Sequence, residues 1–249
     1  MPTPFESRTA LVLGQEGVEK LHAAHVIVFG LGGVGGYAAE ALARAGVGRL
    51  TLVDDDRVAE SNLNRQILAL TGTVGRPKAE VAAERIRQIN PACTARAAAL
   101  FYTPETADAL PFEGADYVVD AVDTVTAKLE IIGRARAAGV PVISCMGTGN
   151  KLHPELLRLS VLEKTEGCPL ARVMRRECRA RGYKNVPVVF SPEAPVRAKT
   201  AADEALAGEA QPGRPGSPKR QTPGSVSFVP GAAGLLLAGK VVRDIAGVE

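Results

Sequence analysis

The sequence has few cysteines, and none of them form the Cys-x-x-Cys pair that is typical of a structural zinc site. We therefore expect no structural metal and interpret the cysteines as buried thiols. The chain does not open with the charged and apolar regions of a secretory signal, which favours a cytoplasmic protein whose thiols stay reduced. The four cysteines are Cys93, Cys145, Cys168 and Cys178.

The sequence also lacks a long apolar run and an excess of charge of one sign. Its longest apolar stretch, 226–238, is interrupted by proline and glycine and is shorter than the roughly 20 residues of a membrane span. With 30 basic and 27 acidic residues, the net charge of +3 does not by itself demand a polyanionic partner. The apolar fraction of 46% in 249 residues is ordinary for a globular protein. We expect one domain over 1–249, with a nucleotide-binding core over 1–150 and a substrate or dimer region over 151–249.

Apolar runs alternate with helix-forming segments through the first 150 residues. This alternation predicts an α/β fold with a doubly wound, Rossmann-like and mostly parallel sheet. The predicted strands are 26–29, 50–53, 117–119 and 140–145, and the predicted helices are 37–45, 78–89 and 127–138, after a short lead-in helix that ends near 17–22.

The region after Lys151 is less regular and predicts an irregular C-terminal extension. Residues 156–162 and 186–190 have strand-like composition, and 170–181 is a basic helix. Residues 192–223 contain proline, glycine and charge with few large apolar side chains, a composition that predicts a mobile loop. Residues 225–245 regain apolar character and predict a closing strand and helix.

Four glycines follow the first predicted strand and precede the first long helix: Gly30, Gly32, Gly33 and Gly35. In this context glycines allow a tight turn and let phosphates approach backbone N–H groups at the helix N-terminus. Asp54 lies 19 residues beyond Gly35, at the end of the next strand, and would accept hydrogen bonds from ribose hydroxyls. These features alone fit an NAD-dependent dehydrogenase equally well.

Three charged residues favour a triphosphate over a dinucleotide. Arg65 and Lys78 could neutralise charge on a departing pyrophosphate, and Asp123 could hold Mg²⁺. Lys78 begins a predicted helix, where its charge opposes the helix dipole unless an anion lies between them. The alternative is that both cations are solvated surface charges and that Asp123 caps the following helix.

The order of these residues resembles the ubiquitin-activating-like adenylating enzymes. By this resemblance, Asp54 binds ribose, Asn62, Arg65 and Lys78 bind the phosphates, and Asp123 binds magnesium, so ATP and Mg²⁺ are the expected cofactors. The residues matching the family's nucleotide site are Gly30, Gly32, Gly33, Gly35, Asp54, Asp56, Asn62, Arg65, Gln66 and Lys78, with Asp120 and Asp123 further along.

Arg8 matches an arginine that in this family reaches the phosphates of the neighbouring subunit. The resemblance therefore implies a homodimer in which Arg8 acts in trans, and the expected catalytic residues are Arg8, Arg65, Lys78 and Asp123.

Within the family, the chain is similar to the tRNA threonylcarbamoyladenosine dehydratases. Relatives that serve thiamine and molybdopterin synthesis carry two Cys-x-x-Cys pairs, which this chain lacks. The segments similar to the dehydratases are 8–11, 64–70, 86–91, 123–128, 146–152, 168–175 and 223–230. The similarity implies adenylation of the threonyl carboxylate of a modified adenosine in tRNA, followed by ring closure. Adenylation of the C-terminus of a ubiquitin-like or sulfur-carrier protein, and a nucleotide-dependent scaffold without catalysis, remain alternatives.

Basic residues recur at helical spacing in the predicted helix 170–181. They could contact several phosphates of a tRNA, although a solvated helix face would have the same pattern. These residues are Arg172, Arg175, Arg176 and Arg179. Cys168 precedes Pro169 at the start of this helix. Some relatives form thioesters on a cysteine, but the implied reaction needs none, so we interpret Cys168 as structural.

Overall fold

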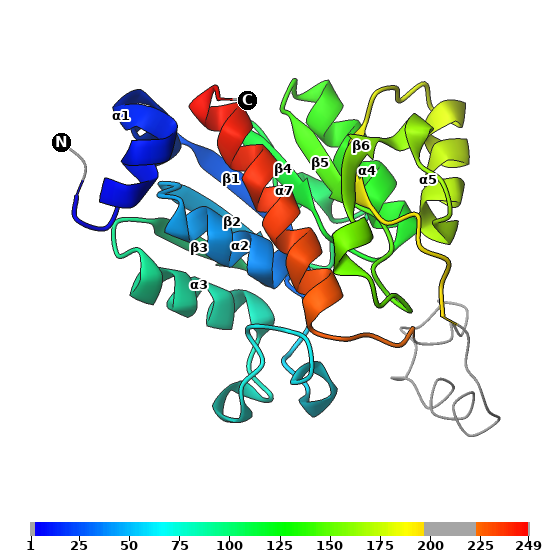
Figure 1. The fold of residues 1–249 in the computed structure, drawn as a ribbon, viewed down its shortest axis with the longest axis horizontal. Helices are drawn as coiled ribbons and strands as arrows, with labels where there is room; N and C mark the ends of the chain where they lie inside the picture. Colours follow the sequence, from blue (N-terminus) through cyan, green and yellow to red (C-terminus); the bar gives the residue numbers. More distant parts are fainter. Residues whose placement is uncertain (1–2, 197–222, 249) are drawn as a thin grey trace.

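The computed structural model describes residues 3–196 and 223–248, and in this part of the chain seven strands form one sheet (Figure 1). The strand order is β3-β2-β1-β4-β5-β7-β6, and only the pairing of β6 with β7 is antiparallel. The strands are β1 (His25–Phe29), β2 (Arg49–Val53), β3 (Thr94–Ala98), β4 (Tyr117–Asp120), β5 (Val142–Cys145), β6 (Arg158–Val161) and β7 (Pro187–Phe190).

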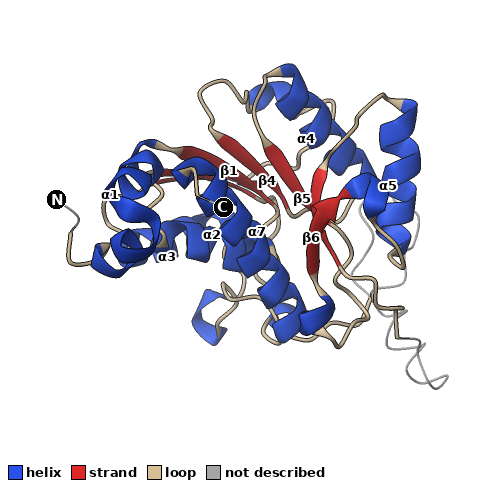
Figure 2. Ribbon diagram, turned by 45° about the horizontal axis from the view of Figure 1, so that its top comes forward, coloured by secondary structure: helices blue, strands red, loops and turns tan. Residues whose placement is uncertain are grey.

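Helices cover both faces of this sheet (Figure 2). On one face lie α1 (Ser7–Ala23), α2 (Gly35–Arg44), α3 (Lys78–Ile89) and α7 (Phe228–Ala246), and on the other lie α4 (Val125–Ala137) and α5 (Pro169–Ala180). None of the helices in the described residues is long and apolar enough to cross a lipid bilayer.

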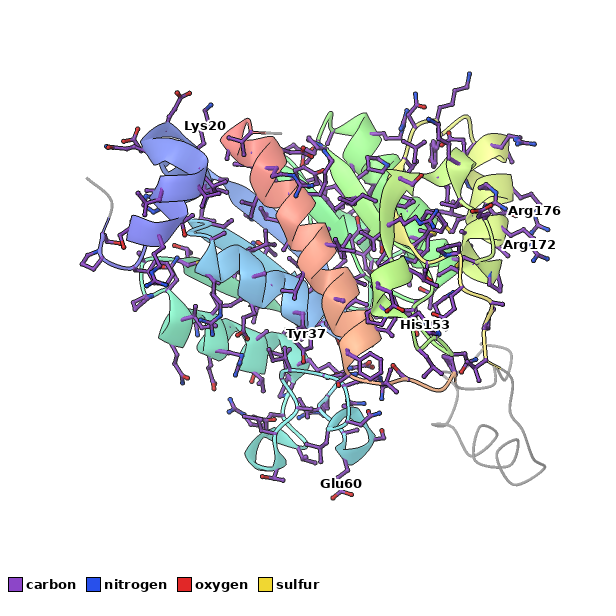
Figure 3. The ribbon with its side chains drawn as sticks, viewed as in Figure 1. Lys20, Tyr37, Glu60, His153, Arg172 and Arg176 are labelled. Atoms are coloured by element: carbon purple, nitrogen blue, oxygen red, sulfur yellow. The ribbon has the colours of Figure 1, made fainter. Side chains whose placement is uncertain are left out.

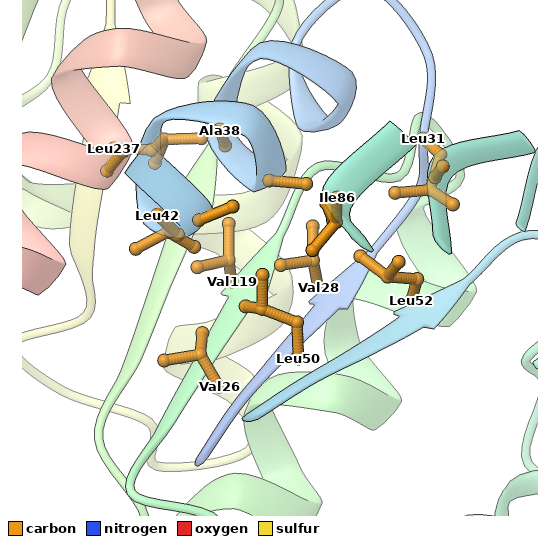
Figure 4. Packing of buried hydrophobic residues seen from close by; sticks show 14 of the residues in the cluster. Val26, Val28, Leu31, Ala38, Leu42, Leu50, Leu52, Ile86, Val119 and Leu237 are labelled. Carbon is orange, nitrogen blue, oxygen red and sulfur yellow. The ribbon is translucent and has the colours of Figure 1, made fainter. Parts of the chain in front are cut away.

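The central strands are apolar throughout because both of their faces are buried. In β1, Val26 and Val28 pack under α2 and α3 (Figure 4), while Ile27 and Phe29 point into the second core beneath α4 and α5. Strands buried on two sides are expected to show continuous apolar runs in place of alternation. The expected doubly wound α/β fold is confirmed.

The strand order reverses at β1. From β1 the chain runs to β2 and β3 on one side, and then crosses to β4 and β5 on the other. In an open parallel sheet such a reversal leaves a crevice outside the carboxyl ends of the two strands that flank it, here β1 and β4. The glycine turn follows β1 directly and therefore lies at this crevice.

Two elements differ from the expectations. Strand β3 was not predicted, because its sequence is mostly alanine with no apolar run, and the strand forms by pairing with β2 at the sheet edge. The predicted closing strand after Ser225 is wrong, since only α7 follows. The backbone of Gly224 instead bonds to the loop after β5, where Asn150 N donates to Gly224 O at 2.8 Å. Of the predicted mobile loop, residues 197–222 lie outside the described residues.

Helices α2 and α7 cross in close contact at a glycine. A Cβ atom on Gly234 would lie 2.3 Å from Val34 O and 2.9 Å from Tyr37 Cβ. Gly239, five residues further along α7, has space, since the nearest atom to its Cβ would be Arg243 Nη1 at 3.6 Å. Only the first glycine is required by packing.

We expect Gly234→Ala to lower the free energy of unfolding by about 2 kcal/mol, because overpacking forces the helices apart. Gly239→Ala is the matched control in the same helix, and it should raise the stability by roughly 0.5 to 1 kcal/mol because alanine loses less backbone entropy on folding. Chemical denaturation of both variants measures the two effects. Equal effects of the two substitutions would contradict the close crossing.

Candidate nucleotide site

The glycine turn between β1 and α2 is shaped by two contacts that exclude a side chain. Gly30 has a φ of 80°, and a Cβ there would lie 2.7 Å from Ala121 O. A Cβ on Gly35 would lie 1.7 Å from Gly30 O. No side chain caps the N-terminus of α2. Free N–H groups at a helix N-terminus favour an anion, so the turn offers a place for phosphate.

Asp54 ties the end of β2 to this turn. Its Oδ2 accepts a hydrogen bond from Leu31 N at 2.6 Å, and its Oδ1 accepts one from Asp56 N at 2.8 Å. Burial raises the pKa of Asp54 above its ordinary value, and the nearby ammonium of Lys78 partly offsets this rise. The carboxylate therefore lies against the glycine turn, where sequence analysis placed it.

Lys78 is buried at the first position of α3, with 5% of its surface exposed. Its Nζ donates to Asp56 Oδ2 at 2.9 Å, and its backbone N donates to Asp56 O at the same distance. The expected conflict between this ammonium and the dipole of α3 is therefore relieved inside the protein by Asp56. Half of the Asp56 side chain is exposed, so the pair lies at the surface of the crevice.

Arg65 is partly buried and lies three residues after the 3₁₀ turn Glu60–Asn62. Its Nη1 donates to Ser61 O at 2.9 Å and to Asn64 Oδ1 at 3.0 Å, and no carboxylate of the described residues pairs with it. Burial lowers its pKa. A half-buried guanidinium bonded only to neutral groups retains capacity for an anion.

Asn62 and Gln66 are buried on either side of Arg65. Asn62 Oδ1 accepts from Ala59 N at 3.1 Å and so shapes the turn. Gln66 is 7% exposed, and its Nε2 lies 3.8 Å from where a Cβ on Gly32 would be. Its Oε1 is buried without a hydrogen-bond donor from the described residues. An unsatisfied buried acceptor is costly, so this amide is suited to receive a ligand donor.

Asp123 lies exposed in the loop between β4 and α4. The two residues before it, Ala121 and Val122, are the ones that a Cβ on Gly30 would strike. Asp123 therefore directly follows two residues that pack against the glycine turn. A second group of carboxylates, from Asp54 to Asp56, has oxygens within 4.8 Å of one another, although Asp56 is already paired with Lys78.

Arg8 lies near the amino-terminal ends of the central strands, whereas the glycine turn of its own chain lies at their carboxyl ends. Two residues earlier, Glu6 contacts His22, and Glu6 Oε1 would lie 3.8 Å from a Cβ on Gly46, in the loop before β2 begins. Strands β1 and β2 begin at this end of the sheet, whereas the glycine turn follows the end of β1. Arg8 therefore lies away from the other candidate residues of its own subunit.

The basic residues of α5 do not all share one exposed face. Arg172, Arg176 and Arg179 are exposed, and Figure 3 shows the first two extending outward from the helix. Arg175 is directed inward, where its Nη1 donates to Thr165 O at 2.7 Å.

Cys168 is the N-cap residue of α5 and is 2% exposed. Its burial is consistent with the structural interpretation.

Two sets of contacts at the site were not predicted from the sequence. Asp120 and Lys128 form a fully buried ion pair, with Lys128 Nζ 3.1 Å from Asp120 Oδ2. A lysine among apolar residues in the first turns of a helix was the available signal. The start of α7 and the segment before it also border the site, because Asn64 Nδ2 donates to Ser225 O at 3.0 Å and Pro230, in the first turn of α7, would contact a Cβ on Gly33. Contacts so distant in sequence leave no local signal.

Comparison with known proteins agrees with this geometry. Residues 6–249 match the ThiF family. The chain is 42% identical over 246 residues to a tRNA threonylcarbamoyladenosine dehydratase of Bacillus subtilis (strain 168), covering 96% of this chain and 93% of that one. It is 41% identical over 194 residues to the protein of that name from Escherichia coli (strain K12), covering 75% and 72%. A crystal structure of the E. coli dehydratase in complex with ATP is similar, with a TM-score of 0.83, 34% identity, and 97% and 93% coverage.

We expect Lys78→Met to raise the pKa of Asp54 further, because it removes the ammonium that partly offsets the effect of burial. Carboxyl carbon shifts followed by NMR over a pH titration measure this pKa. Because the folded pKa exceeds the unfolded one, the stability linked to Asp54 is full at low pH and is lost as the pH rises through the folded pKa. Lys20→Met, at the opposite edge of the sheet, is the control. An unchanged Asp54 pKa in Lys78→Met would contradict the coupling.

Proposed function

The chain belongs to the ThiF family, and we propose that it is an ATP-dependent tRNA threonylcarbamoyladenosine dehydratase. The observation that carries the proposal is the crevice itself, where an uncapped helix N-terminus, a half-buried Arg65 and a buried Lys78 surround a glycine turn. This arrangement suits a polyphosphate. The dehydratases at 42% and 41% identity supply the substrate class.

The proposed reaction has two steps. The threonyl carboxylate oxygen attacks the α-phosphorus of ATP, the bond to the β-phosphate oxygen breaks, and pyrophosphate leaves. The neighbouring carbamoyl group of the same nucleoside then attacks the acyl carbon, and AMP leaves as the ring closes. Because this second nucleophile is part of the substrate, proximity supplies much of the rate and no enzyme nucleophile is needed.

The residues around the turn would bind the nucleotide in a defined orientation. Asp54 would accept from the ribose hydroxyls, and the N–H groups at the start of α2 would bind phosphate. Arg65, Lys78 and Asn62 would contact the phosphates. The two cations would stabilise the charge that develops on pyrophosphate as it departs, and this stabilisation is the main catalytic contribution of the protein.

The residues present fit a magnesium ion bound together with ATP. Mg²⁺ is usually held by one or two carboxylates and by substrate phosphates. Asp123 offers an exposed carboxylate on the loop that packs against Gly30, so it would hold the ion at the phosphates. The ion, when bound, would neutralise part of the triphosphate charge.

We expect Arg65→Ala and Asp123→Asn each to lower kcat for tRNA-dependent AMP formation by about two to three orders of magnitude, because both groups act on developing charge. Neither residue belongs to the core, so thermal unfolding should be little changed. Arg57→Ala removes an exposed arginine near the same crevice and should keep near-normal activity. Full activity of either site variant would refute its assignment.

Helix α1 supports a homodimer in which Arg8 completes the site of the partner. Leu11 and Val12 follow Arg8 in this helix and are 86% and 80% exposed. Exposed apolar side chains close together mark surfaces that another protein covers. A second copy that covers them would place Arg8 at the interface between the subunits, where it would be available to the nucleotide site of the partner.

A complementation experiment tests whether Arg8 acts in trans. Arg8→Ala and Asp123→Asn should each be inactive alone, whereas equal amounts of both, mixed and allowed to exchange subunits, should recover about one quarter of wild-type activity. Half of the dimers are then mixed, and one of the two sites in each mixed dimer has both residues. If Arg8 acted within its own subunit, mixing would recover nothing.

The tRNA would approach along the outer side of α5. Arg172, Arg176 and Arg179 could each contact a phosphate there, whereas Arg175 is bonded to Thr165.

We place the reaction in the cytoplasm, because the four cysteines of the chain are all free thiols.

Mass spectrometry of nucleosides tests the proposed function directly. tRNA that bears threonylcarbamoyladenosine is incubated with the protein and magnesium ATP, and the modified nucleoside should lose the mass of one water while AMP and pyrophosphate form. No mass change and no tRNA-stimulated AMP would refute it. Adenylation of a sulfur-carrier C-terminus in place of tRNA would support the alternative. Normal activity of Cys168→Ala would exclude a thioester step.

A further inference from the structure

The Asp120–Lys128 pair lies directly beneath the candidate site. Both side chains are fully buried, and Lys128 Nζ has four acceptors: the two carboxylate oxygens of Asp120 at 3.2 and 3.1 Å, Ser144 Oγ at 3.3 Å and Cys145 O at 2.7 Å. Ser144 Oγ also donates to Asp120. The network thus joins the ends of β4 and β5 to the second turn of α4.

Asp120 also holds the loop that follows it. Its Oδ1 accepts a hydrogen bond from Val122 N at 3.2 Å, while Ala121 N donates to Phe29 O at 2.8 Å. Ala121 and Val122 are the residues that press against Gly30. The loop is therefore fixed at one side by β1 and at the other by a carboxylate that Lys128 orients.

A buried ion pair is a poor way to gain stability alone. Desolvation of two charges offsets their attraction, and well-packed apolar residues of similar size are often as stable or more so. Here the pair has a directional consequence, because the carboxylate orients a backbone N–H one residue before Asp123. Orientation of a ligand-bearing loop through a buried partner is a known requirement of metal sites.

We propose that Asp120 is a positioning residue: the oxygen that accepts from Val122 N sets the place of Asp123, and through it the affinity of the site for magnesium-bound ATP. Lys128 compensates the buried charge of Asp120. This inference rests on the proposed role of Asp123. Both side chains of the pair are fully buried, so neither would touch a nucleotide in the crevice. The effect of Asp120 should appear in the gain in ATP affinity that magnesium provides, since a purely structural pair would change stability without changing that gain.

Two double variants separate charge from orientation. Asp120→Asn with Lys128→Met removes both charges but keeps an amide oxygen that can accept from Val122 N. Asp120→Leu with Lys128→Met removes both charges and that acceptor. Neither leaves a single buried charge, which is what would make Lys128→Met alone prone to unfold. Thermal unfolding first establishes that both fold. Tyr117→Phe is the control, because it removes a 2.8 Å bond to Asp244 at the other end of the same strand.

Calorimetry of ATP binding with and without Mg²⁺ then gives the readout. In the leucine variant, the factor by which magnesium raises the affinity for ATP should be about tenfold or more smaller than in wild type. The asparagine variant and Tyr117→Phe should stay within about threefold of wild type, because loop orientation persists in both. A kcat that falls in the leucine variant at saturating ATP would accord with this.

The proposal is overturned if magnesium raises the ATP affinity of the folded leucine variant as much as that of wild type. It is also overturned if magnesium does not raise the ATP affinity of wild type. The binding measurement contains no tRNA, so it is independent of the dehydratase assignment. A protein that leaves modified tRNA unchanged but shows the predicted loss would disprove the proposed reaction and keep the positioning role.

Discussion

The close approach of two backbone segments at Gly30 is the constraint on which the site depends. The turn after β1 lies against the loop after β4, and the space between them admits no Cβ atom. This contact exists because β1 and β4 are neighbours at the reversal of the strand order. It brings the phosphate-binding turn and the loop of Asp123 together, although they are about 90 residues apart in sequence.

Charge is compensated around this contact in two different ways. Lys78 and Lys128 are buried and have internal carboxylate partners, Asp56 and Asp120. Arg65 is half-buried and bonds only to neutral groups among the described residues. The charges of the two lysines are compensated without a ligand, while the arginine leaves positive charge for an anion. Such a division gives a preorganised site whose groups need little rearrangement when charge develops.

Local patterns predicted most of the elements correctly. The apolar run of β1, the glycines after it and the helix 78–89 that starts after Pro77 have signals within a few residues, so they were found. Strand β3 and the course of the chain before α7 were not, because both are decided by partners: β2 pairs with β3, and Asn150 bonds to Gly224. Secondary structure that depends on distant partners has no local signature.

The sequence alone determined the fold class and the types of residue in the site, because hydrophobic periodicity and the conformational demands of glycine are local properties. The tertiary structure decided which charged groups have partners within the protein and which do not. It paired Lys78 with Asp56, bonded Arg175 to Thr165, and held Arg8 at the far edge of its own sheet. These outcomes depend on distances between segments remote in sequence, and the interaction of two charges is fixed by their separation and burial in the folded chain.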